Sequence, residues 1–396
     1  MSTLRLLPLG PGERVLDALD FLAEAVVGVA DGSDAHLPVP ADDAGETRRL
    51  ADAMAVDTDI DPDIAMVVST SGTTGTPKGA QLTSTALRAS ATATHRHLGG
   101  PGGWLLALPG HHIAGLQVLL RSIASGYEPV VIDVSVGFDP DDLVTGLERM
   151  GAPRRYTSLV PTQLIKVLDH PRATAALAET DGVLVGGAAT PVALRERAIA
   201  TGIPIVRTYG MSETCGGSVY DGIPLDGVDV TILSPDADGV GRVSLGGAVV
   251  ASGYRNLPDH AAFADPGRFR TDDLGRLDDG VLTVVGRADE AISTGGLTVV
   301  PQVVEAAILS DPAVADCAVV GLPDARLGAR VVAAVVAAAG GEPSTESVRA
   351  TVTDRLGGLA APREVLVVSE LPRRGPGKVD RRALVAQWAG YSQPFR

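Results

Sequence analysis

Short apolar runs alternate along this chain with alanine-rich segments of helical length, and this rhythm is the strongest constraint on its fold. The apolar run Trp104–Leu108 is followed by a helix-length segment at Gly115–Ser125 and by a second apolar run at Pro129–Asp133. Continuous Val, Ile and Leu runs are typical of parallel strands that are buried on both faces and joined by helices. The same alternation recurs through the apolar runs Gly182–Val185 and Ile203–Val206. The sequence therefore predicts an α/β fold whose large N-terminal part contains mostly parallel sheets flanked by helices.

The pattern of predicted strands and helices changes at two places along the chain. Between residues 228 and 286, short strands alternate with Gly and Asp turns, which predicts a β-rich subdomain. From Val299 onward the order is helix, strand, strand, helix and a last strand at Glu364–Val368. A small α+β domain of about a hundred residues fits this order. We place the boundary at Gly286–Asp289, so that residues 1–286 form the N-terminal domain and residues 287–396 a C-terminal lid domain.

Composition limits the partners and the compartment. The net charge is -15, from 48 acidic and 33 basic side chains, and no cluster of Lys and Arg resembles a nucleic-acid-binding stripe. The two cysteines, Cys215 and Cys317, are too few for a disulfide framework and lack metal-ligand spacing. The chain shows no pattern of a signal peptide, and its most apolar run, Val331–Ala339, is too short to cross a bilayer. We expect a cytoplasmic protein with small-molecule substrates, without nucleic acid or membrane insertion, and with a homodimer left open.

A loop rich in hydroxyl groups follows the apolar run Ile64–Val68. The segment Ser69–Gly79 adds three glycines and one lysine to its serines and threonines. Phosphate oxygens need many donors at once, and glycine lets backbone N–H groups approach without a Cβ in the way. The spacing does not match a Walker A loop, so this segment predicts a polyphosphate site of another kind, with a solvated turn as the alternative. The residues that we assign to the phosphates are Thr70, Ser71, Gly72, Thr73, Thr74 and Lys78.

Later segments resemble, in order and spacing, the motifs of the adenylate-forming superfamily. This superfamily comprises acyl- and aryl-CoA ligases, peptide-synthetase adenylation domains and luciferases. Several motifs in register make chance agreement implausible, although each segment alone could be a turn, a linker or a basic tail. The segments are Gly186–Pro191, Thr208–Thr214, Phe269–Gly275, Gly286–Gly296 and Pro372–Arg382.

The resemblance implies a nucleotide site for ATP and Mg²⁺. Tyr209 would lie along the adenine, Ser212 would reach the α-phosphate, and Glu213 would hold the magnesium ion together with phosphate oxygens. The glycine-rich adenine pocket would contain Gly186 and Gly187.

The same resemblance assigns the ribose and the domain hinge. Asp273 would accept the ribose hydroxyls, although Asp272 replaces the glycine usual in the family. Arg287 would contact ribose or phosphate, and Asp289 would be the hinge. CoA, the cosubstrate, would reach the site through a tunnel lined by Gly295 and Gly296.

Lys378 matches the catalytic lysine of the family. Its ammonium would reach the acyl carboxylate and the α-phosphate, where charge develops during adenylation. In the family mechanism the carboxylate attacks the α-phosphate to give acyl-AMP and pyrophosphate, and the thiol of CoA then displaces AMP. Closure of the C-terminal domain would serve the first step and rotation about the hinge the second.

The acid substrate is inferred from Pro109–Arg121, which resembles an element of the o-succinylbenzoate–CoA ligases of menaquinone biosynthesis. By this resemblance His112 would wall the acyl pocket, and Arg121 would clamp the benzoate carboxylate as a bidentate partner. The alternatives are that Arg121 snorkels to the surface, that the substrate is another aryl or fatty acid or the acceptor a carrier-protein thiol, and that the protein binds nucleotide without catalysis. The segment before the phosphate loop is shorter than is usual in these relatives.

Overall fold

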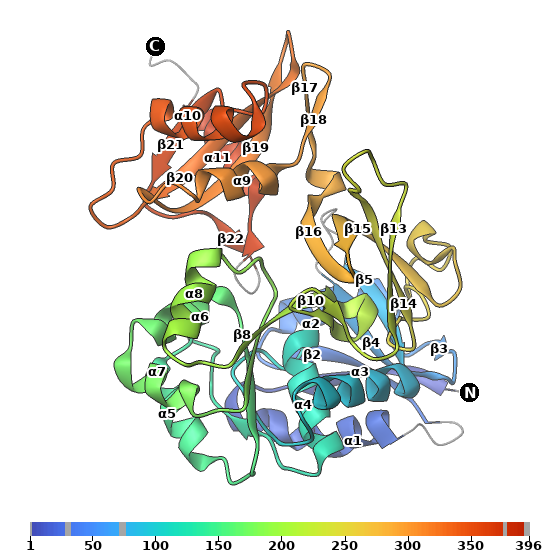
Figure 1. The fold of residues 1–396 in the computed structure, drawn as a ribbon. Coiled ribbons are helices and arrows are strands. Elements are labelled where there is room, and N and C mark those ends of the chain that lie inside the picture. Colours follow the sequence, from blue (N-terminus) through green and yellow to red (C-terminus); the bar gives the residue numbers. More distant parts are fainter. Residues whose placement is uncertain (1, 28–32, 71–76, 375–377, 392–396) are drawn as a thin grey trace. The chain divides into compact units, whose positions relative to one another are not determined.

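In the computed structural model, the predicted parallel strands form the centre of a seven-stranded sheet (Figure 1). Its order is β12-β11-β10-β9-β8-β6-β7, and the pairs from β7 to β10 are parallel, whereas β11 and β12 run antiparallel. The strands are β6 Gly103–Leu106, β7 Val130–Val131, β8 Arg155–Leu159, β9 Gly182–Val185, β10 Ile205–Met211, β11 Gly216–Tyr220 and β12 Ile223–Pro224. The expected α/β alternation is confirmed.

The structure describes residues 2–27, 33–70, 77–374 and 378–391. The chain divides into two compact units. The first unit contains Met1–Thr231, Ser244–Arg270 and Asp279–Leu282, and the second contains Ile232–Val243, Thr271–Asp278 and Thr283–Arg396. Because this division passes through the β-rich segment, a single domain boundary after residue 286 stays a prediction, as does the hinge.

A second sheet of the first unit is built largely from the residues before the phosphate loop. Its order is β3-β1-β2-β4-β5, with β1, β2 and β4 parallel and both edge strands antiparallel. The strands are β1 Ser2–Leu9, β2 Ala35–Pro40, β3 Asp59–Ile60, β4 Ile64–Thr70 and β5 Lys78–Thr83. The phosphate loop therefore connects two antiparallel neighbours.

Helices cover both sheets of the first unit. The largest core joins α1, α3 and α4 to strands of both sheets, through side chains such as Leu22, Leu87, Leu116, Val68 and Trp104. A separate core packs α5 to α8 on the seven-stranded sheet. The helices are α1 Leu19–Val27, α2 Ala44–Met54, α3 Ser84–His97, α4 Ile113–Ser125, α5 Pro140–Arg149, α6 Pro161–Leu168, α7 Pro171–Ala178 and α8 Val192–Ala200.

The β-rich segment forms a four-stranded sheet in the order β13-β14-β15-β16. Its strands are β13 Val228–Leu233, β14 Gly241–Gly247, β15 Arg268–Asp278 and β16 Val281–Arg287. The strands β13, β14 and β16 correspond to the short strands expected in this region, and β15 contains the motif Phe269–Gly275.

The second unit also contains a five-stranded sheet with helices on both faces (Figure 1, orange to red). Val304 and Val348 bury α9 and α10 in one core, while Leu384 and Trp388 bury α11 in another. The elements are β17 Ile292–Thr294, β18 Leu297–Val299, α9 Pro301–Ile308, β19 Val314–Asp324, β20 Gly328–Ala337, α10 Thr345–Leu356, β21 Glu364–Val368, β22 Arg373–Arg374, β23 Lys378–Val379 and α11 Arg381–Tyr391. Among the described helices of the whole chain, none is long and apolar enough to cross a membrane.

Candidate nucleotide and acyl site

The predicted adenine residues lie near the carboxyl ends of β9 and β10, two neighbouring strands inside the seven-stranded sheet. Gly186 directly follows β9, and Thr208 and Tyr209 lie on the parallel neighbour β10. A Cβ on Gly186 would lie 2.3 Å from Oγ1 of Thr208 and 3.3 Å from its carbonyl oxygen, so a larger residue at position 186 would displace the Thr208 side chain. Gly187 adds a φ of +79°, which favours glycine. Two motifs that are separate in the sequence are thus brought together where α/β sheets commonly bind ligands.

The predicted magnesium ligand follows β10 in a short 3₁₀ turn, Ser212–Thr214. Glu213 is only 6% exposed, and Ser212 is similarly buried. The hydroxyl of Tyr254 donates a hydrogen bond of 2.5 Å to Oε1 of Glu213. No group of three or more His, Cys, Asp or Glu side chains within the described part of the chain could hold a metal ion. A cation at Glu213 would therefore take most of its ligands from phosphates and water, as Mg²⁺ commonly does.

The lysine of the phosphate loop begins β5. Its backbone pairs with Thr70, the last residue of β4, while the assigned residues Ser71, Gly72, Thr73 and Thr74 lie outside the described residues. The Lys78 ammonium lies 3.2 Å from Nε2 of His260 and 5.0 Å from the ring centroid of Tyr254. Tyr254 therefore contacts both a predicted phosphate ligand and the predicted magnesium ligand.

Sequence reasoning missed three residues that border this loop. They are Tyr254, Asn256 and His260, which follow strand β14 of the β-rich segment. Asn256 accepts the backbone N–H of Gly79 and donates to the carbonyl of Pro77, so it fixes the end of the loop. These contacts join residues more than 170 positions apart, and only the glycine-aromatic pair Gly253–Tyr254 could have drawn notice in the sequence.

Arg121 is buried, with 3% of its surface exposed. Its Cζ atom lies 5.2 Å from the ring centroid of Trp104, and its Nε is buried without a hydrogen-bond partner. No described residue accepts a hydrogen bond from this guanidinium or forms an ion pair with it. Burial lowers the pKa of Arg121, although the nearby Tyr220 acts in the opposite direction. The alternative that Arg121 snorkels to the surface is therefore wrong.

Among the described residues near Arg121 are a buried amide and a neutral histidine. Gln117 lies one turn earlier on α4, and both polar atoms of its buried amide also lack partners. Burial and the charge of Arg121 lower the pKa of His95 to about 4, so its neutral ring accepts the indole N–H of Trp104 at 3.1 Å. His112 is the exposed N-cap of α4, and its ring lies tilted against that of His111, with the centroids 4.3 Å apart. Its role as a pocket wall stays a prediction.

The cysteine beside the magnesium motif has no features of a nucleophile. Cys215 is fully buried, and burial raises the pKa of its thiol far above the usual range. The thiolate, which is the reactive form, is therefore scarce. Cys215 does have a structural role, because its carbonyl accepts the hydroxyl of Ser90.

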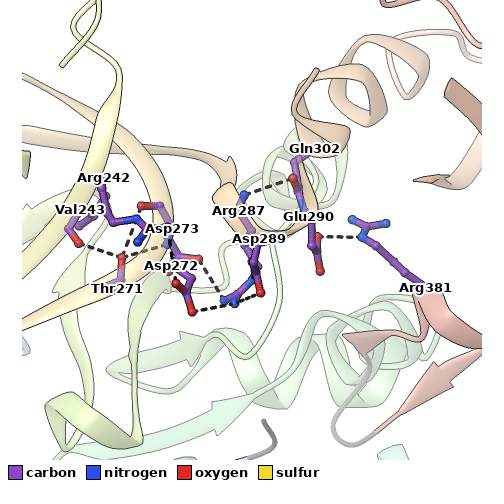
Figure 2. A network of polar contacts seen from close by, with 10 residues as sticks. All are labelled: Arg242, Val243, Thr271, Asp272, Asp273, Arg287, Asp289, Glu290, Gln302 and Arg381. Atoms are coloured by element: carbon purple, nitrogen blue, oxygen red, sulfur yellow. Dashed lines mark hydrogen bonds and ion pairs between the residues drawn. The ribbon is translucent and has the colours of Figure 1, made fainter. Parts of the chain in front are cut away.

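In the second unit, Arg287 is shared by three carboxylates (Figure 2). It makes a two-pronged contact with Asp289, with both N–O distances at 2.9 Å, and lies 3.4 Å from Asp273 and 3.6 Å from Asp272. Burial lowers the pKa of Arg287, but the three ion pairs outweigh it and raise the pKa above its usual value. The predicted ribose, phosphate and hinge residues are thus brought together. Asp273 is 9% exposed, whereas the Asp272 side chain is half exposed and also pairs with Arg242 at 3.6 Å.

The two predicted tunnel glycines form the turn between β17 and β18. Gly295 has a φ of +57° and Gly296 a φ of +83°. Positive φ at both central positions of a two-residue hairpin strongly favours glycine. The backbone N–H of Gly295 also donates to the carbonyl of Leu327 at 2.9 Å, which fixes the turn on the second unit.

Lys378 opens β23, whose backbone pairs with β22. Three residues later, Arg381 forms a fork with Glu305, with N–O distances of 2.7 and 3.2 Å. Figure 2 shows its other contact, the hydrogen bond of 2.8 Å that its Nε donates to Glu290. Glu290 also accepts Gln302, whose carbonyl oxygen accepts the backbone N–H of Arg287. The chain segment that carries Lys378 is thereby connected to the segment next to Asp289.

We expect Arg381→Leu to destabilise the second unit, because it leaves Glu305, whose side chain is only 15% exposed, without its arginine partner. Breaking a buried pair in this way costs about 3–5 kcal/mol. Burial already raises the pKa of Glu305, so the loss should shrink at acidic pH, where the isolated carboxyl takes up a proton. Denaturant unfolding of the full chain measures this. The matched control is Arg276→Leu, which removes the exposed pair with Asp278 and should cost at most about 1 kcal/mol. Equal losses in both variants would contradict the expectation.

Comparison with known proteins identifies the family of this chain. Residues 13–255 match the model of the AMP-binding enzyme family, and residues 303–378 match its C-terminal domain. A Mycobacterium tuberculosis protein named probable 2-succinylbenzoate–CoA ligase is 56% identical over 378 residues, which cover 94% of this chain and 96% of that protein. The segment before the phosphate loop is therefore of similar length in at least one relative.

Solved structures give the same result. The o-succinylbenzoate CoA synthetase of Bacillus subtilis, in complex with its acyl-adenylate intermediate, superposes with a TM-score of 0.78 at 25% identity, over 97% of this chain and 88% of that one. The same enzyme with ATP and magnesium gives a TM-score of 0.76 at 25% identity, over 97% and 89%. The expected fold is confirmed, and this chain belongs to the family of AMP-binding enzymes.

Proposed function

We propose that this protein converts o-succinylbenzoate to o-succinylbenzoyl-CoA at the expense of ATP. In the first step a carboxylate oxygen of the substrate attacks the α-phosphorus, which forms o-succinylbenzoyl-AMP and releases pyrophosphate. In the second step the sulfur of CoA attacks the acyl carbonyl, the thiol proton is lost, and AMP leaves. This is an acid–thiol ligase reaction, and it would serve menaquinone biosynthesis.

The observation that carries the proposal is the buried Arg121 without an anionic partner. A guanidinium taken out of water costs several kcal/mol unless an opposite charge compensates it. In the part of the chain that the structure describes, no carboxylate supplies that charge. The aromatic carboxylate of o-succinylbenzoate would do so, while its succinyl carboxylate remains available for adenylation. An alkyl chain would leave the cost uncompensated, which argues against a fatty acid.

The other site residues take the roles that their positions support. Gly186, Gly187 and Tyr209 would hold adenine, and Ser212 and the phosphate loop would hold the phosphates. Mg²⁺, bound by Glu213 and phosphate oxygens, would neutralise charge on the departing pyrophosphate.

The second unit would supply the remaining groups. Asp273 would hold the ribose, with Arg287 at ribose or phosphate, and Lys378 would stabilise the charge that develops at the α-phosphate. Rotation about Asp289 would then bring Gly295 and Gly296 to the thiol of CoA. We also infer action in the cytoplasm, which the two buried and unbridged cysteines support; a homodimer is compatible with this function.

The test is AMP release with different acids, each with and without CoA. We expect AMP and acyl-CoA from o-succinylbenzoate, and far less from benzoate or decanoate. AMP from no acid would support a nucleotide-binding protein without catalysis, and equal AMP from benzoate would contradict the assignment of Arg121. Acyl-AMP without acyl-CoA would point to another thiol, such as that of a carrier protein.

A further inference from the structure

Tyr254 connects two residues of the nucleotide site that are far apart in the sequence. Its hydroxyl donates to Glu213, and its ring faces the ammonium of Lys78. We propose that Tyr254 is a positioning residue, which fixes the magnesium-binding carboxylate and the phosphate-binding lysine relative to each other. This inference rests on the roles given to Glu213 and Lys78 in the proposed function.

The hydrogen bond fixes the orientation of the carboxylate. At 2.5 Å it is as short as hydrogen bonds from a hydroxyl to an ionised carboxylate. Tyr254 is 3% exposed and Glu213 6%, so water competes little for this contact. Because one oxygen of the carboxylate is held, the direction of the other is also set before magnesium arrives. The hydrogen bond from Tyr254 therefore helps to order the carboxylate before the ion binds.

The ring of Tyr254 is itself held in place. Tyr254 pairs through its backbone with Ala80 of β5, and the next residue donates its N–H to the carbonyl of Gly79 at 2.8 Å. The ring packs edge-on against Phe263 and His260, with both centroid distances at 5.0 Å. The tyrosine is therefore anchored on the strand that carries Lys78 while its hydroxyl reaches Glu213. Supporting contacts of this kind preorganise the residues that touch the ligand.

The Lys78 ammonium makes a second, separable contact with the same ring. At 5.0 Å from the centroid it is within cation–π distance. Removal of the hydroxyl alone should therefore affect Glu213, and removal of the whole ring should affect Lys78 as well. This difference allows each part of the proposal to be tested.

The first test measures the dissociation constant of ATP by calorimetry, with magnesium and with EDTA. In Tyr254→Phe we expect the gain in ATP affinity due to magnesium to fall about tenfold, with unchanged affinity in EDTA. In Tyr254→Leu we expect weaker binding in EDTA also. The matched control is Tyr156→Phe, which removes a hydroxyl that donates to the carbonyls of Leu98 and Gly100, and it should bind ATP like the unmodified protein. An unchanged magnesium effect in Tyr254→Phe, or an equal loss in Tyr156→Phe, would overturn the proposal.

A double substitution tests whether the hydroxyl acts through the carboxylate. Once Glu213→Gln has removed the magnesium ligand, the further change Tyr254→Phe should have no additional effect on the magnesium dependence of ATP binding. An equal loss in both backgrounds would mean that Tyr254 acts elsewhere. The measurement needs no acid substrate, so a failure of the o-succinylbenzoate assignment would leave this result readable. If the unmodified protein shows no magnesium-dependent ATP binding, both the role of Glu213 and this inference fail.

Discussion

Lys378→Ala should reduce formation of acyl-AMP by a factor of about 10² to 10³, the usual effect of removing one group that stabilises charge in a transition state. Its ammonium is the cation that we assign to the α-phosphate, where negative charge increases during attack. The second half-reaction should change little, because there the thiol of CoA displaces AMP from an adenylate that is already formed. Pyrophosphate release measures the first step, and conversion of supplied o-succinylbenzoyl-AMP to the thioester measures the second.

The chain offers a matched control for this substitution. It contains three lysines, Lys78, Lys166 and Lys378, and Lys166 donates to the carbonyl of Phe138 away from the predicted site. Lys166→Ala should leave both half-reactions close to those of the unmodified protein. Equal loss of both half-reactions in Lys378→Ala would refute the assignment of this residue to adenylation alone.

Arg121→Leu should leave the protein at least as stable and make the enzyme less active. Replacing a buried charge that has no anionic partner among the described residues by an apolar side chain removes a desolvation penalty, so the free energy of unfolding without ligand should stay level or rise. The substrate carboxylate would lose its partner, and truncation of one side of a buried charge pair costs about 2–5 kcal/mol. We therefore expect kcat/KM for o-succinylbenzoate to fall by about 10²-fold or more, with unchanged binding of ATP.

A substrate analogue makes this prediction specific. 4-Oxo-4-phenylbutyrate keeps the carboxylate that is adenylated and lacks the aromatic one. The unmodified enzyme should strongly prefer o-succinylbenzoate over this analogue, whereas Arg121→Leu should use both at similar, low rates. Arg121→Lys keeps the charge but loses the planar fork, so its preference for o-succinylbenzoate should lie between those of the unmodified enzyme and Arg121→Leu. If Arg121→Leu keeps the preference of the unmodified enzyme, the carboxylate partner is not Arg121.

Strands whose signal is local could be predicted closely. The apolar runs Gly182–Val185 and Glu364–Val368 coincide with β9 and β21, because turn residues bound each run. The run at Ile203–Val206 gave only part of β10, which continues to Met211 by pairing with β11. That extension depends on a partner strand further along the chain, and its Tyr-Gly sequence alone is typical of a turn.

The residues of the candidate site also divide into those with a local signal in the sequence and those without one. Gly186, Tyr209 and Glu213 lie in contiguous motifs with characteristic spacing, so resemblance could predict roles for them. Tyr254 can be recognised as a candidate only from its contacts with Lys78 and Glu213, and no periodicity in the sequence predicts such contacts. The burial of Arg121 could not be predicted either, because a helix with one arginine is compatible with a charge at the surface.

The indole of Trp104, between His95 and Arg121, provides a built-in optical probe. The chain has two tryptophans, and the other, Trp388, lies in the second unit, where its N–H donates to Glu364. In a Trp388→Phe variant, all indole emission would come from the neighbourhood of the arginine. An anion that binds the guanidinium changes the electric field at that ring. Addition of increasing amounts of o-succinylbenzoate without ATP, followed by fluorescence, would therefore report occupancy of the acyl site before any reaction occurs.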